Sequence, residues 1–98
     1  MLEDRHVVRY LSRNDGDEVS AEVPNAVRYD LTFRELAGAQ GAFTTASRAW
    51  EIARDELPYQ PQDGDRIEEV ATGAAWSVGE VTETLLGHVW RLLCNKER

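Results

Sequence analysis

The sequence predicts a mainly β domain: a small closed or partly open antiparallel β-barrel of about six to eight short strands with one long loop. Apolar and polar residues alternate along several short segments, which is the period of a strand with one buried face. Turn residues separate these segments about every eight to twelve residues, a spacing typical of small barrels and sandwiches. The 98 residues fit a single domain, residues 1–98, with one hydrophobic core.

The clearest alternation lies in residues 18–34. Polar neighbours alternate there with two apolar series, Val19, Ala21, Val23 and Val27, Tyr29, Leu31, Phe33. Residues 7–11 are β-branched and aromatic, and residues 13–17 tolerate left-handed turn conformations. A hairpin is therefore expected between residues 6–12 and 18–23. Pro24-Asn25 then predicts a break, because proline has no N–H group for the strand ladder.

The middle of the chain has weaker patterning. Residues 35–46 contain Gly38, Gly41 and four alanines, which predicts a loop of about a dozen residues. Residues 45–57 allow two interpretations. Trp50 and Ile52 fit one face of a strand, whereas a helical face with Thr45 as N-cap would hold Ala46, Ala49, Trp50, Ala53 and Leu57.

Turn signals are dense in the C-terminal half. Pro58 and Pro61 end the preceding element, and residues 63–65 form an Asp-Gly-Asp turn into a strand at 66–68. After a Thr72-Gly73 turn, Trp76 and Val78 share one strand face. Residues 88–94 are apolar on both faces, which predicts a strand covered on each side by its own chain or by a neighbouring subunit.

Charge and cysteine content narrow the functional classes. Eighteen acidic against eleven basic residues give a net charge of −7, which disfavours sequence-specific DNA binding but lets DNA pass close by. The single Cys94 has no disulfide or zinc-site partner, which fits a reducing compartment. No membrane segment or signal peptide is expected, because no long apolar run occurs and acids stand near the N-terminus.

Candidate catalytic and metal-binding groups are few. His6 and His88 have no serine or cysteine nucleophile pattern nearby. The Asp15–Asp17 and Asp63–Asp65 pairs lack the further ligands of a calcium loop. Glu68 and Glu69, as strand neighbours, would point to opposite faces and are expected in solvent. We therefore expect no enzyme activity, no metal, no cofactor and no small-molecule ligand.

The three tryptophans supply much apolar area for so short a chain. Trp76 is expected in the core. Trp50 and Trp90, together with Leu92, are candidates for a subunit interface, where tryptophan is enriched, with core filling as the alternative.

Residues 47–94 resemble a known family. The pattern Leu57-Pro58-x2-Pro61-x2-Gly64-Asp65-x-Ile67 is followed by Gly73-x2-Trp76-x-Val78 and a closing Trp90-Arg91-Leu92 strand. This order is similar to the small head-tail joining, head-closure or stopper proteins of tailed bacteriophages and prophages. The resemblance places a strand at residues 47–53, which favours the strand interpretation there.

The resemblance implies a structural virion protein without enzyme activity. It would assemble as a ring that continues the DNA channel, with portal or adaptor and tail proteins as partners, in the virion neck and, during assembly, in the host cytoplasm. A long loop toward the channel is typical of the family, so Glu35, Gln40 and an exposed Phe43 are candidate channel-loop residues. The alternative is a small monomeric β-barrel module that binds a peptide strand along an exposed edge.

Overall fold

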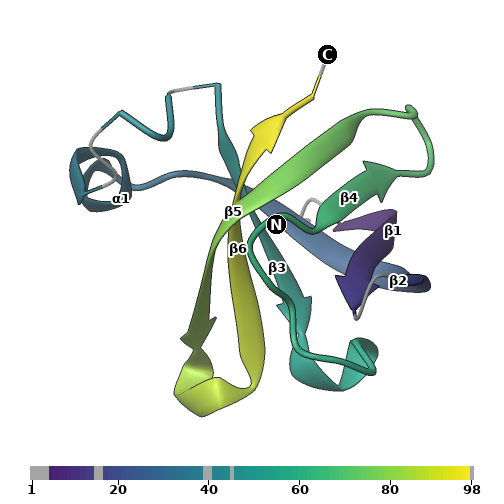
Figure 1. Cartoon of the computed structure of the whole chain (residues 1–98). Coiled ribbons are helices and arrows are strands. Elements are labelled where there is room, and N and C mark those ends of the chain that lie inside the picture. Colours follow the sequence, from purple (N-terminus) through teal and green to yellow (C-terminus); the bar gives the residue numbers. More distant parts are fainter. Residues whose placement is uncertain (1–4, 15–16, 39–40, 45, 98) are drawn as a thin grey trace.

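A computed structural model describes residues 5–14, 17–38, 41–44 and 46–97. These residues form a closed antiparallel barrel of six strands in the order β1-β2-β3-β6-β5-β4 (Figure 1). The predicted mainly β barrel is therefore confirmed. Along the chain the elements are β1 (Arg5–Asn14), β2 (Asp17–Asp30), α1 (Phe33–Gly38), β3 (Arg48–Ala53), η1 (Arg54–Glu56), β4 (Arg66–Glu69), β5 (Ala75–Thr84), η2 (Leu85–Gly87) and β6 (Val89–Lys96).

The first hairpin is confirmed, but the predicted break at Pro24 is a bulge inside one long strand. Two residues of β2, between Val23 and Ala26, lie opposite one residue of β1. An extra residue reverses which side chains face the barrel interior. Ala26 is therefore buried, and Tyr29, in the apolar series predicted from the alternation, is 42% exposed.

The segment after β2 is helical where a strand end and a loop were predicted. Strand β2 ends at Asp30, and Thr32 and Glu35 form a capping box that starts α1. The Glu35 backbone N–H donates to Thr32 Oγ1 (3.1 Å), and the Thr32 N–H donates to Glu35 Oε1 (2.8 Å). The prediction of a loop over residues 35–46 is thus wrong for residues 35–38. In Figure 1, α1 stands away from the strands at the left.

Residues 48–53 form a strand, as the family resemblance indicated. Strand β3 pairs with β6 along its whole length and with the end of β2, so a helix in this segment would open the barrel. The predicted turns also hold: Gly64 (φ 93°) and Gly73 (φ 77°) adopt left-handed conformations just before β4 and β5.

All three tryptophans fill the barrel interior. Trp50, Trp90 and Leu92 are 0%, 3% and 0% exposed, so their prediction as subunit-interface residues is wrong. They occupy alternate positions on β3 and β6 that face inward, and a six-stranded barrel needs bulky side chains to fill its centre. Trp76, predicted in the core, packs edge to face on Trp50 with ring centroids 6.0 Å apart.

A second layer covers the outer side of β6. Leu93 is fully buried but lies outside the main core cluster. Phe43 is 8% exposed and lies against Gly79 of β5, next to the Leu93 backbone. The Asn95 side-chain amide of β6 donates to the Ala42 carbonyl (3.1 Å). Strand β6 is thus covered by its own chain, and the prediction of an exposed Phe43 is wrong.

Candidate functional site

The first candidate site is α1, because it contains Glu35, one of the predicted channel-loop residues. The Arg91 guanidinium of β6 donates two hydrogen bonds to the Glu35 carboxylate, from Nε to Oε2 (2.7 Å) and from Nη2 to Oε1 (2.9 Å). Its Nη1 donates to Glu51 Oε2 on β3 (2.7 Å). These bonds lower the pKa of Glu35 to about 2 and raise the pKa of Arg91. We call these three residues the Arg91 clamp, which fixes α1 to the barrel wall.

Of the other channel-loop candidates, Phe43 is packed on the barrel, and Gln40 lies outside the described residues. The large apolar side chain that α1 exposes is Phe33, which is 86% exposed. Sequence reasoning assigned Phe33 to a strand and missed it. The signal was present, since Thr32-x-x-Glu35 is a capping box that ends the alternation one residue before Phe33.

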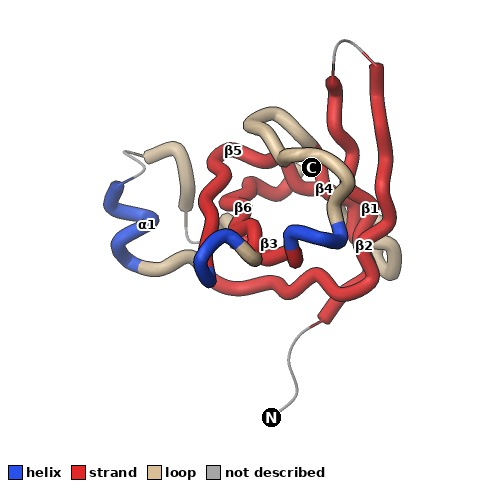
Figure 2. The backbone as a smooth tube through the Cα atoms, turned by 90° about the horizontal axis from the view of Figure 1, so that it is seen from below, coloured by secondary structure: helices blue, strands red, loops and turns tan. Residues whose placement is uncertain are grey.

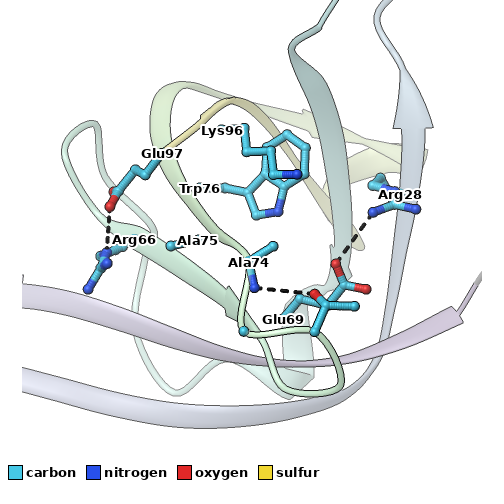
Figure 3. Close-up of a pocket in the computed structure, with 10 residues that line it drawn as sticks. Arg28, Arg66, Glu69, Ala74, Ala75, Trp76, Lys96 and Glu97 are labelled. Carbon is cyan, nitrogen blue, oxygen red and sulfur yellow. Dashed lines mark hydrogen bonds and ion pairs between the residues drawn. The ribbon is translucent and has the colours of Figure 1, made fainter.

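The second candidate site is a pocket of about 590 Å³ at one mouth of the barrel (Figure 3). At its base Glu69 is buried, contrary to the expectation that it lies in solvent. Glu69 Oε2 lies 3.0 Å from His6 Nδ1, and Glu69 Oε1 lies 3.4 Å from Arg28 Nη1. Its neighbour Glu68 points outward to Arg9, so the two carboxylates face opposite sides as predicted.

The rim of this pocket also holds charged groups with partners. Arg66 Nε donates to Glu97 Oε1 (2.9 Å), and Lys96 Nζ lies 5.9 Å from the centroid of the Trp76 ring. Figure 3 shows Lys96 over Trp76 on one side of the pocket and the Arg28–Glu69 pair on the other. Both carboxylates of the pocket are paired with basic side chains, Glu69 with His6 and Arg28 and Glu97 with Arg66.

The third candidate group surrounds Asp65, which the sequence placed in a turn. Asp65 is buried and accepts hydrogen bonds from the Tyr10 hydroxyl (2.5 Å), the Ser12 hydroxyl (3.3 Å) and the Gln62 N–H (2.8 Å). Burial and the bond to Asp65 raise the pKa of Tyr10, so this phenol stays protonated. The Asp65 carboxylate thus links the turn before β4 to strand β1 and accepts three hydrogen bonds from the protein.

The described part of the chain offers few side chains for redox chemistry or metal binding. Cys94 is buried in the barrel, and burial raises the pKa of its thiol, which removes thiolate reactivity. No group of three or more potential metal-ligating side chains occurs among the described residues. The same residues include no helix that is long and apolar enough to cross a membrane.

Comparison with protein-family models and with curated proteins gives no match for the chain. Among solved structures, the chain is similar to the solution structure of protein SF1141 from Shigella flexneri 2a. The two chains are 12% identical with a TM-score of 0.61, and the match covers 96% of this chain and 93% of the other. At that identity the likeness shows the barrel fold alone.

Proposed function

We propose that the chain is a structural protein of the head-tail connector of a tailed phage or prophage, assembling as a ring that continues the DNA channel. The supporting observation is that two elements project from a closed, filled barrel (Figure 2). One is the β1–β2 hairpin, and the other is α1 with its exposed Phe33. Rigid projections with an aromatic anchor are typical of surfaces that bind other proteins.

The hairpin is the better candidate for an element that lines the channel. Strand β1 pairs with β4 only over Val8–Leu11, and β2 pairs with β3 only over Val27–Asp30. Toward the turn, from Arg13 of β1 and up to Val19 of β2, the described residues of each strand pair only with the other strand of the hairpin. In the sequence, residues 13–18 hold one basic and three acidic residues. An acidic tip in the channel would repel the DNA backbone and keep the DNA mobile.

Ring assembly from identical copies needs a head-to-tail interface that closes by rotation. The closed barrel favours side-chain contacts for this interface, because six paired strands leave few free edges within the barrel itself. Its neighbours along the neck would be the portal or adaptor protein and the tail proteins, with DNA passing through unbound.

The test is assembly with the neck partners. We expect negative-stain images and mass photometry to show rings when the chain is mixed with its portal and the adjacent neck protein. A chain that stays monomeric with both partners would overturn the proposal. Portal, capsid or tail genes beside its gene would support it.

The alternative, a monomeric module that binds a peptide strand, is favoured by one observation. From Asp17 to Ala26 the outer edge of β2 pairs with no described strand, which leaves backbone groups available for an added strand. Pro24 interrupts this edge, which shortens it. Under this alternative the chain remains monomeric with the neck proteins, and a bound extended peptide shifts the amide resonances of β2.

A further inference from the structure

Phe33 is a preorganised apolar knob. The capping box orders the first turn of α1, and the Arg91 clamp attaches α1 to β3 and β6. The Phe33 ring nevertheless stands in solvent, 86% exposed, so its burial in a partner would be favourable. Arg34 beside it is also exposed and forms no ion pair with the described residues. Because the backbone turn that carries Phe33 is already ordered, its burial would cost little backbone entropy, so Phe33 is suited to anchor a partner.

A pocket of matching size lies elsewhere on the barrel, between η1 and the start of β6. Its volume is about 150 Å³, and its lining is Arg54, Leu57, Pro58, Tyr59, Gln60 and Trp90. This volume is close to that of one phenyl ring. The pocket is open to solvent and is lined by polar groups of Arg54 and Gln60 as well as by Leu57 and Pro58, so it would cover one face of an inserted ring. The Arg54 guanidinium lies over the Trp90 ring (4.5 Å to the centroid) and walls one side.

The knob and the pocket are on different sides of the molecule. In Figure 1, α1 lies at the left of the barrel, and the segment after β3 lies at the bottom. Phe33 therefore cannot fill the pocket of its own chain while the Arg91 clamp holds. A second copy can supply the ring. Arg34 adjoins the knob and the exposed Asp55 adjoins the pocket, while Arg54 in the pocket lining is already paired with Glu83 (3.4 Å).

We propose that Phe33 of one copy inserts into the pocket formed by Leu57, Pro58 and Tyr59 of the next copy, with Arg34 facing Asp55. This inference rests on the proposed ring assembly and names its interface. Because the two surfaces differ, the contact is head-to-tail and propagates around a ring.

The contact predicts a specific complementation. Phe33→Asp removes the knob, and Pro58→Arg, at an exposed position, covers the pocket. Each variant alone should lose ring assembly with the neck partners. An equimolar mixture should form dimers and nothing larger, because only one intact knob can meet one intact pocket. Val70→Asp, at another exposed apolar position, is the matched control and should assemble as the parent does. Far-ultraviolet circular dichroism checks that each variant folds.

The outcomes separate the inference from the proposed function. If the parent and Phe33→Asp both form rings, the inference is overturned and the connector function stands. If the parent forms no ring with its partners, the connector function fails, and disulfide trapping tests the contact alone. The double variant Arg34→Cys/Asp55→Cys, at the two positions that face each other in the proposed contact, should then give a ladder of linked oligomers under oxidation. The native Cys94 is buried and does not compete. No ladder beyond the background of the single-cysteine variants overturns the inference.

Discussion

Asp65 is the residue at which side-chain chemistry reinforces barrel closure. Strand β4 meets β1 over four residue pairs, which is a short seam for a closed sheet. Asp65 lies just before β4, and its carboxylate binds the hydroxyls of Tyr10 and Ser12 on β1. The seam is therefore joined by backbone bonds and by a buried carboxylate whose donors come from both sides.

Replacing Asp65 should cost more than replacing its strongest donor. Asp65→Ala leaves the buried Tyr10 hydroxyl without its acceptor and also removes the acceptors of the Ser12 hydroxyl and the Gln62 N–H, so we expect the free energy of unfolding to fall by about 2–5 kcal/mol. Tyr10→Phe leaves the carboxylate its other donors and should cost about 1 kcal/mol. Urea denaturation measures both. Equal losses for the two variants would contradict a central role for the carboxylate.

Glu35 should make the attachment of α1 depend on acidity. Its pKa in the folded chain is about 2, below its ordinary value of 4.5, because Arg91 binds the ionised form. A lowered pKa stabilises the docked helix fully above about pH 4.5, and this stabilisation is lost as pH falls toward 2. Carboxyl-resolved NMR titration should find the Glu35 midpoint near 2.

Glu35→Gln is the matched variant for this titration. Glutamine keeps the capping box with Thr32 but removes the charge that Arg91 binds. Hydrogen exchange of the α1 amides should be faster in the variant than in the parent at pH 7, and equally fast in both near pH 2. An unchanged exchange rate at pH 7 would show that the Arg91 clamp does not hold the helix.

At the scale of elements, local sequence signals predicted where strands and turns occur, but not where each strand ends. Pro24 correctly marked an interruption of the ladder, yet pairing on both sides keeps β2 continuous and makes the interruption a bulge. The Thr32-x-x-Glu35 box was readable and would have predicted α1. The Arg91 clamp was not, because Glu35 and Arg91 are 56 residues apart and no local pattern links them.

The packing of Phe43 on the barrel can be tested at Gly79. A β-carbon at Gly79 would lie 2.9 Å from the Phe43 ring, closer than carbon atoms pack. Gly79→Ala should therefore lower the free energy of unfolding by about 1–3 kcal/mol. In a Phe43→Ala background the same substitution should cost nothing, since the ring is gone and alanine suits a strand better than glycine. Thermal unfolding of the parent, the two single variants and the double variant gives a double-mutant cycle. Additive effects of the two substitutions would contradict the contact between Phe43 and Gly79.

At the scale of the whole molecule, the sequence predicted the barrel class but not the destination of its aromatic side chains. The sequence left Trp50 and Trp90 two destinations, the core and a subunit interface, because tryptophan is common at both. Closure of the sheet turns both inward, and the exposed aromatic anchor is Phe33 instead. Closure depends on pairs such as β1 with β4, whose partners are more than fifty residues apart, so which face becomes interior was not readable from short windows.

Net charge gives the last prediction. Each copy carries −7, so copies repel one another over a range set by salt, about 30 Å at 0.01 M and about 10 Å at 0.1 M. The Phe33 contact is apolar and depends little on salt. Association should therefore increase as sodium chloride rises from about 10 to 100 mM, as mass photometry can measure. Binding to DNA through phosphate contacts would weaken over this range.

Arg34→Gln removes the only attraction proposed between charges at the contact, so it should weaken association most at low salt, where that attraction is least screened. A fall in association of the parent chain with added salt would mean that ion pairs, and not the buried ring, hold the copies together.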